Sequence, residues 1–265
     1  MKWYDWIVEK LGIDPASDRR ATHILSELMK NKTPDLNELE NLIEDRVVIV
    51  FGAGPSLSDH LSILKPYIRI LHKELVLISA DGATKALLEE NILPDIIVTD
   101  LDGDLGAIVE AGRRGSYILV HGHGDNIELI KKYVSMFLNQ GFKVIGTTQV
   151  EPLNNVFNFG GFTDGDRCVF LAHYFNASRI ILAGMDLGYV IGEYSGRYFS
   201  EKPLLFKRKI VKLEITGKLL DWITCRHYIP TYTLSKSISN CILEVNENQL
   251  PIILRSSTKQ FNLNT

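Results

Sequence analysis

The sequence lacks an apolar run long enough to cross a membrane. A transmembrane helix needs about 20 consecutive, mostly apolar residues, and no segment of the 265-residue chain approaches that length. The first residues, Met1–Trp6, do not carry the apolar core of a signal peptide either. We therefore expect a soluble, cytoplasmic protein without a membrane partner.

Cysteine is scarce, with three residues at Cys168, Cys225 and Cys241. They are scattered, odd in number and never spaced as C-x-x-C. The spacing therefore supports neither a thiolate zinc site nor a disulfide framework. We expect buried thiols in a reduced cytosol.

An excess of basic residues is also missing, because 29 Lys and Arg stand against 32 Asp and Glu, for a net charge of −3. Nucleic-acid-binding proteins usually show a basic excess or stripe, so we expect no nucleic-acid partner. The remaining composition, 45% hydrophobic and 23% charged, is ordinary for a globular protein that buries a core.

Residues 1–45 predict a helical N-terminal appendage. Apolar residues at positions 3, 6, 7 and 11 follow helical spacing, and Gly12 marks a stop. Further helices are expected at Arg20–Lys30 and from Pro34 to about residue 45, with Pro34 in the first turn. The appendage could cover a sheet, or it could form a contact between two copies of the chain. A homo-oligomer is therefore one of the two alternatives.

From residue 46 to 190, short apolar runs alternate with helical patterns. The expected strands are Val47–Phe51, Leu75–Ser79, Ile96–Thr99, Tyr117–Val120, Lys143–Ile145 and Arg179–Leu182. The expected helices are Leu57–Leu64, Thr84–Glu90, Leu105–Arg113, Asp125–Asn139 and Asp166–Phe175. Near-continuous β-branched runs indicate strands buried on both faces. The pattern predicts an α/β domain with a Rossmann-like, mostly parallel sheet flanked by helices.

Residues 191–265 predict a small C-terminal extension. Gly188–Phe206 reads as a loop rich in Tyr, Gly and Ser, which could act as a lid, and Lys207–Thr224 as an amphipathic helix. Ile242–Val245 and Ile252–Leu254 are weak strand candidates.

The first candidate motif, Gly52-Ala53-Gly54-Pro55-Ser56, follows the first predicted strand. Glycines let the backbone approach a phosphate, and the next helix presents free N–H groups to it. Leu57 stands where a dinucleotide loop has its third glycine, so the motif indicates a dinucleotide site only weakly. A tight turn with Pro55 at a helix start explains it as well.

Carboxylates follow the next two strands, in Asp81-Gly82 and in the alternating Asp100, Asp102 and Asp104. In extended chain, side chains at i and i+2 share one face, so these like charges would repel each other without a cation. Mg²⁺ fits because it takes oxygen ligands and bridges substrate phosphates. A solvated acidic turn is the alternative, and Asp81 could instead cap the next helix.

Later motifs are less specific. His123 and Asp125 lie in a glycine-rich loop that could reach phosphates, whereas too few Cys or His residues are near to complete a zinc site. Candidate substrate contacts are Thr148, Gln149, Phe162, Asp164 and Asp166, because such residues suit a flat heteroaromatic ring; ordinary turns with core phenylalanines are the alternative. Lys207 and Lys209, with Lys212, form a basic helix start that could neutralise a polyphosphate, although a solvated face is the default.

The order of these motifs resembles two families of pyrophosphokinase. Asp81-Gly82, Pro94–Asp102 and Gly124–Asn126 are similar to the Asp-Gly-Gly turn, the Pro-Asp…Gly-Asp-Phe-Asp-Ser segment and the Thr-Asp of thiamine pyrophosphokinases. The resemblance is closer to the archaeal 6-hydroxymethyl-7,8-dihydropterin pyrophosphokinases of tetrahydromethanopterin-type pterin biosynthesis. Their pattern is matched, over roughly residues 46–190, by Gly52–Leu57, Asp100–Asp104, His121–Asn126 and Gly160–Asp166.

Two departures favour the pterin family. Thr99 stands where the thiamine enzymes have Gly, and Gly103 stands where they have the closing Ser. The C-terminal part also lacks an evident all-β thiamine-binding domain.

The resemblance implies Mg²⁺-dependent transfer of pyrophosphate from ATP to the hydroxymethyl group of the pterin, with release of AMP. Asp100 and Asp102 would hold Mg²⁺, with Asp81 and Asp125 as partners, and catalysis would rest on Asp100, Asp102 and Asp125. ATP would contact Gly52, Gly54, Pro55, Ser56, Asp81, Gly82, His123, Lys207 and Lys209. Transfer to thiamine or another small alcohol, and a non-catalytic nucleotide-binding module, stay open as alternatives.

Overall fold

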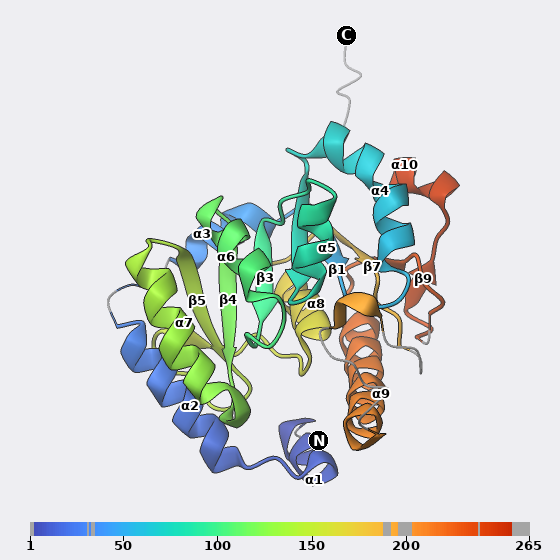
Figure 1. The fold of residues 1–265 in the computed structure, drawn as a ribbon. Coiled ribbons are helices and arrows are strands. Elements are labelled where there is room, and N and C mark those ends of the chain that lie inside the picture. Colours follow the sequence, from blue (N-terminus) through green and yellow to red (C-terminus); the bar gives the residue numbers. More distant parts are fainter. Residues whose placement is uncertain are drawn as a thin grey trace.

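A parallel β-sheet runs through the centre of the molecule, with helices on both of its faces (Figure 1). The structure, a computed structural model, describes residues 3–30, 32, 35–187, 192–195, 203–237 and 239–255. Within these residues the strand order is β6-β5-β4-β3-β2-β1-β7-β8-β9, and every neighbouring pair is parallel. The strands are β1 (Val47–Phe51), β2 (Leu75–Ala80), β3 (Ile96–Thr99), β4 (Tyr117–Gly122), β5 (Lys143–Thr148), β6 (Val156–Phe157), β7 (Arg179–Ala183), β8 (Thr231–Thr233) and β9 (Ile242–Glu244).

The helices form two layers, one on each face of the sheet (Figure 1). One layer contains α2 (Pro15–Leu28), α4 (Leu57–Leu71), α5 (Ala83–Glu89), α6 (Leu105–Arg113), α7 (Ile127–Asn139) and α10 (Leu250–Ile253). The other contains α1 (Trp3–Leu11), α3 (Leu36–Ile43), α8 (Asp164–Tyr174) and α9 (Pro203–Arg226). Short 3-10 turns lie at η1 (Gly124–Asn126), η2 (Glu193–Ser195) and η4 (Glu247–Gln249).

Strand β1 shows why its sequence is apolar throughout. Val48 and Val50 pack against the layer of α8 and α9, whereas Val47, Ile49 and Phe51 pack against that of α4. Successive side chains of a strand point to opposite faces, so a strand covered on both sides needs an unbroken apolar run. The predicted Rossmann-like α/β fold is confirmed.

The strand order reverses between β1 and β7. From β1 the chain moves outward through β2, β3, β4 and β5 to β6, and then returns through α8 to β7, on the other side of β1. In open α/β sheets, ligands bind outside the carboxyl ends of the strands at such a switch point. The topology therefore places the expected crevice beside the Gly52–Ser56 loop.

The N-terminal helices pack onto this framework. α2 packs against α7 and the strands β4 and β5, and its Leu25 and Met29 are fully buried. The ring of Trp3 in α1 meets that of Trp222 in α9 edge to face. The division of the chain near residues 45 and 190 stays a prediction.

Several boundaries differ from the predictions. The strands β6 and β8 are too short to show a period in the sequence, and Ile252–Leu254, expected as a strand, overlaps the helix α10. α2 begins earlier than predicted because the Asp14 carboxylate accepts the N–H groups of Ala16 and Ser17. Residues 188–191 and 196–202 of the expected lid, and Pro34, lie outside the described residues.

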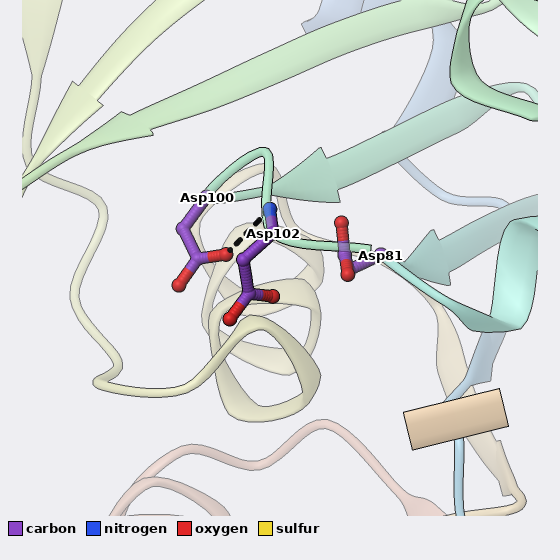
Figure 2. A group of neighbouring side chains, drawn as sticks. All are labelled: Asp81, Asp100 and Asp102. Carbon is purple, nitrogen blue, oxygen red and sulfur yellow. Dashed lines mark hydrogen bonds between the residues drawn. The ribbon is translucent and has the colours of Figure 1, made fainter. Parts of the chain in front are cut away.

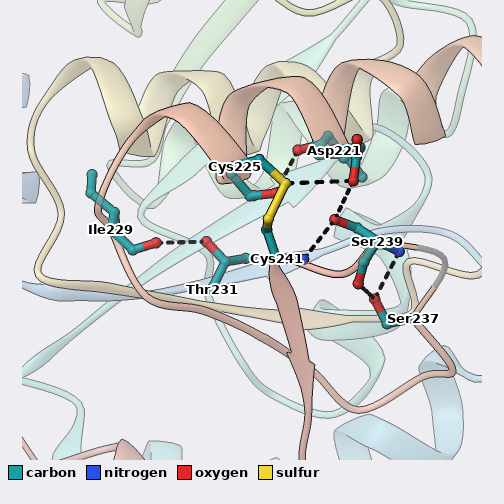
Figure 3. Close-up of a disulfide and its surroundings, with 9 residues drawn as sticks. Asp221, Cys225, Ile229, Thr231, Ser237, Ser239 and Cys241 are labelled. Carbon is teal, nitrogen blue, oxygen red and sulfur yellow. Dashed lines mark hydrogen bonds between the residues drawn. A yellow bond between two sulfur atoms is a disulfide. The ribbon is translucent and has the colours of Figure 1, made fainter.

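The expectation of buried free thiols was wrong for two of the three cysteines. Cys225, near the end of α9, is bonded to Cys241, just before β9 (Figure 3). Beside the bond, the Ser239 hydroxyl donates to Asp221 at 2.8 Å. Spacing alone did not reveal this pair because the fold brings together residues on separate elements. Cys168 is a buried free thiol, as predicted.

In the described part of the chain, no helix combines the length and the apolar character that a membrane span requires.

Replacing Cys241 with Ser should lower the free energy of unfolding. The bond joins residues 16 positions apart, and opening a loop of this size costs about 3 kcal/mol through the entropy of the unfolded chain. Urea unfolding with and without dithiothreitol measures the effect. The reductant should destabilise the wild type and leave Cys241→Ser unchanged, whereas identical midpoints for all samples would contradict the bond.

The buried His173 should make the free energy of unfolding decrease as the pH is lowered below about 6.5. Burial, aided by the nearby ring of His227, lowers the pKa of His173 to about 4. Because the unfolded chain protonates this ring near pH 6.5, its contribution is complete above that pH and is lost as pH falls toward 4. The free energy of unfolding should therefore fall less steeply in His173→Leu than in the wild type between pH 6.5 and 4. A difference between the two proteins that does not change with pH would contradict this.

Candidate active site

Three aspartates meet at the carboxyl ends of two neighbouring strands. Asp81 follows β2, and Asp100 and Asp102 follow β3 (Figure 2). Each offers a carboxylate oxygen, and the three oxygens lie within 4.8 Å of one another. Two of the three alternating carboxylates after β3, those of Asp100 and Asp102, therefore lie beside Asp81.

The turn after β3 has the backbone that this convergence requires. The Thr99 hydroxyl accepts the N–H of Leu101 at 2.8 Å and donates to the Asp81 carboxylate. Leu101 is buried and left-handed, with φ of 70°, so its packing holds a conformation that non-glycine residues rarely adopt. A side chain at Gly103 would collide with the Asp81 carboxylate. Thr99 and Gly103, which depart from the thiamine pattern, therefore both shape the position of Asp81.

The electrostatics of this aspartate group suit a cation. Burial, with the neighbouring charge of Asp100, raises the pKa of Asp81 to about 7. Burial also acts to raise the pKa of Asp100, but the hydrogen bond and charge interaction with His123 outweigh it and lower this pKa below the usual range. Three converging oxygen donors are the ligands that Mg²⁺ prefers. The residues present therefore fit a divalent metal, which would neutralise their repulsion.

A cleft opens beside the aspartates at the predicted switch point. Its empty volume, including the part open to solvent, is about 980 Å³. The predicted residues that line it are Gly52, Gly54, Asp81, Gly82, Asp100, Asp102, Phe162, Asp164 and Lys209. Most of the sequence candidates therefore gather in one cavity.

The Gly52–Ser56 loop lies against the loop that follows β7. The N–H of Gly54 donates to the carbonyl of Gly184 at 2.8 Å, and a Cβ at Gly54 would collide with this carbonyl and with the Asp186 carboxylate. That carboxylate accepts the backbone N–H of Ser56 at 2.9 Å and its hydroxyl at 2.7 Å. A carboxylate thus occupies the N-terminus of α4, where the sequence predicted a phosphate.

Arg167 in the first turn of α8 is fixed at the wall of the cleft. Its Nη1 donates to Asp164 at 3.2 Å, and its Nη2 donates to the Nε2 of His121 at 2.8 Å and to Gln149 at 3.1 Å. Burial, with the charge of Arg167, lowers the pKa of His121 well below its usual value, so this ring is a neutral acceptor. Burial, with the charge of Asp100, raises the pKa of Asp164.

Two lysines of α9 line the same cleft. Lys209 and Lys212 are partly buried there, whereas Lys207 is exposed and does not line the cleft. The Lys212 ammonium lies 6.0 Å from the ring centroid of Phe162. Burial lowers the pKa of Lys212, and the charge of Asp100 opposes this. Positive and negative side chains therefore share one cavity.

Other predicted residues lie outside the cleft. His123 contacts Asp100 at 3.3 Å, and Asp125 is exposed and not part of the aspartate group. Thr148 is buried against Thr22 of α2, and Asp166 caps the start of α8 by accepting from Thr163. Pro55 is exposed and does not line the cleft either. Roles for these residues in binding or catalysis stay predictions.

Two residues of the cleft, Arg167 and Asp186, were not predicted from the sequence. Arg167 directly follows the Gly160–Asp166 motif, and Asp186 lies three residues after the end of β7. Lys212, which belongs to the predicted basic helix start, does line the cleft. No local pattern indicated the partners of Arg167, which come from other elements.

The structure is an α/β protein whose cleft, at the carboxyl ends of parallel strands, is lined by both acidic and basic side chains. The model of the family described as 6-hydroxymethylpterin diphosphokinase MptE-like matches residues 22–192. The chain belongs to this family. The predicted pterin-family resemblance and the expectation of an enzyme are confirmed, whereas the relation to thiamine pyrophosphokinases stays a prediction.

Curated relatives carry one name, 6-hydroxymethyl-7,8-dihydropterin pyrophosphokinase. The protein of Methanocaldococcus jannaschii is 47% identical over 83% of this chain and 92% of its own length. That of Methanothermobacter thermautotrophicus is 42% identical over 84% and 93%. That of Pyrococcus furiosus is 40% identical over 84% and 94%.

Among solved structures, the MAf glycosyltransferase of Magnetospirillum magneticum AMB-1 is similar in fold. The TM-score is 0.51 at 16% identity, over 78% of this chain. The matched part is 34% of the glycosyltransferase chain, so this chain spans about a third of that protein. The likeness supports the fold alone.

Replacing Asp100 or Asp102 with Asn should weaken the binding of Mg²⁺ or Mn²⁺ by about tenfold or more, because each change replaces a charged carboxylate with a neutral amide, which is a weaker ligand. Titration calorimetry on the protein without substrates measures this. Glu128→Gln is the control, since Glu128 lies on α7 and is 84% exposed. Equal affinity in the two aspartate variants and the control would contradict the metal assignment.

Proposed function

We propose that this protein transfers the pyrophosphoryl group of ATP to the hydroxymethyl group of 6-hydroxymethyl-7,8-dihydropterin. The products would be AMP and the pterin diphosphate, and the proposed metal is Mg²⁺. The observation that carries the proposal is the group of Asp81, Asp100 and Asp102 in the lining of the cleft. Family membership and the shared name of the curated relatives support the same acceptor.

The proposed reaction is a substitution at the β-phosphorus of ATP. The hydroxyl oxygen of the pterin forms a bond to this phosphorus, and the bond between the phosphorus and the oxygen that bridges to the α-phosphate breaks. AMP leaves with that oxygen, and the hydroxyl proton passes to a carboxylate of the cleft or to water. Transfer of this kind depends on in-line positioning and on neutralising charge. A bound Mg²⁺ would supply part of that neutralisation.

The residues of the cleft suit these tasks. Phe162 and Asp164 lie in its wall and are the proposed contacts of the pterin ring. Gly52, Gly54 and Gly82 line the cleft at the loops after β1 and β2, where the nucleotide is proposed to lie. We keep the cytoplasm as the proposed location.

The wild-type protein should form AMP and pterin diphosphate from ATP, Mg²⁺ and the reduced pterin, detected by chromatography and ³¹P NMR. EDTA should stop the reaction. Asp100→Asn should lower the turnover number by about a hundredfold or more, because charge at the transferred group would then be poorly neutralised.

Thiamine, offered as the acceptor in a parallel sample, tests the choice of alcohol. Glu128→Gln is again the control and should turn over like the wild type. Formation of thiamine diphosphate without pterin diphosphate, or no AMP with either acceptor, would sink the proposal.

A further inference from the structure

The glycine loop after β1 is poorly placed to bind the phosphates that are transferred. The backbone N–H and the hydroxyl of Ser56 already donate to the Asp186 carboxylate, whose other oxygen accepts the Ser235 hydroxyl at 2.8 Å. The helix N-terminus that would attract a phosphate therefore has its anion built in. A polyphosphate there would face the negative charge of Asp186.

Positive side chains gather on the opposite wall instead. Among the described residues that line the cleft, the basic ones are Arg167, Lys209 and Lys212. In the part of the chain that the structure describes, no carboxylate oxygen lies within 4.0 Å of either lysine ammonium. These two ammonium groups are available to a ligand, and an anion is the ligand they would attract.

Arg167 supplies a second, independent sign of an anion site. Its side chain is 9% exposed and pairs with Asp164, yet its Nε is buried with no hydrogen-bond partner. A buried donor without a partner is costly. The guanidinium is fixed at the cleft wall by Asp164, His121 and Gln149, so its positive charge is held in place beside the cleft, where it would attract an anion.

One contact holds the two basic elements together. The Thr163 hydroxyl at the start of α8 lies 2.9 Å from the Thr216 hydroxyl of α9. Lys212 precedes Thr216 by four residues and therefore lies on the same helix face. The first turn of α8, with Arg167, and Lys212 of α9 thus border the same part of the cleft.

We propose that Lys212 and Arg167 bind the pyrophosphoryl group of ATP, that is, its β- and γ-phosphates. This inference rests on the proposed pyrophosphoryl transfer and specifies which wall holds the transferred group. The β- and γ-phosphates then lie between the aspartate group and the basic side chains. The adenosine and the α-phosphate are left for the loops after β1 and β2.

The charges of this arrangement suit the reaction. The phosphate oxygens of the transferred group stay negatively charged while the bond from the β-phosphorus to the bridging oxygen breaks and the bond to the pterin oxygen forms. Lys212 and Arg167 stay bound to the same phosphate oxygens in the product diphosphate, whereas AMP leaves from the other side. Because these contacts are present in bound ATP as well as during the transfer, loss of Lys212 should raise the KM for ATP more than it lowers the turnover number.

The test compares binding of inorganic tripolyphosphate and of AMP, each with Mg²⁺, by titration calorimetry. Lys212→Ala should bind tripolyphosphate at least about tenfold more weakly and AMP as the wild type does, and Lys212→Arg should regain part of the loss, because a cation is restored. Lys218→Ala is the matched control, since Lys218 is on the same helix but exposed and lies over Trp6. For Arg167, which lies in a buried hydrogen-bond network, the variant is Arg167→Lys rather than Arg167→Ala, because lysine keeps a positive charge there. Circular dichroism checks that this variant folds.

Turnover assays on the same variants keep the two proposals distinguishable. If the wild type makes no AMP but Lys212→Ala binds tripolyphosphate more weakly than the wild type, the anion site stands and the proposed function fails. If the wild type turns over and Lys212→Ala matches Lys218→Ala in both assays, the anion site is wrong and the function stands. A loss of tripolyphosphate binding in Ser56→Ala, with unchanged binding in Lys212→Ala, would also overturn the site and return the phosphates to the glycine loop.

Discussion

Repulsion among Asp81, Asp100 and Asp102 is the constraint on which the rest of the site depends. Their oxygens approach within 4.8 Å, and burial raises the pKa of Asp81 to about 7. Charged groups that are withdrawn from water are stable only when they are paired or coordinate a metal. The fold keeps these carboxylates together through the buried Leu101 turn and through Gly103. The three converging carboxylates therefore fit a divalent cation, which would offset their repulsion.

The two walls of the cleft divide the remaining charges. Beside β1, the Asp186 carboxylate closes the N-terminus of α4 and draws the loops after β1 and β7 together. On the other wall, α8 and α9 hold Arg167 and Lys212, joined through Thr163 and Thr216. The N-terminal helix α2 contributes from a distance: its Asp18 accepts from Gln149, which also holds Arg167. A segment expected as an appendage therefore supports the site.

Predictions from sequence succeeded where a local pattern determines the structure. β1, β3 and α6 have the expected bounds, because unbroken apolar runs and caps such as Asp104 act within a few residues. They failed at β6, β8 and α10, where elements of two to four residues depend on neighbours for their pairing. The Cys225–Cys241 bond was missed for the same reason, since it joins a helix to the segment just before a strand.

The sequence by itself determined the α/β class, the carboxylates after β2 and β3 and the resemblance to the pterin enzymes, because strand ends and motif order are read along the chain. Only the tertiary structure decided which of these groups meet. Asp125 is exposed outside the aspartate group, the Ser56 N–H is taken by Asp186, and Lys212 lies in the cleft. The physical reason is that charge interactions act over a few ångströms in space, whatever the separation along the chain.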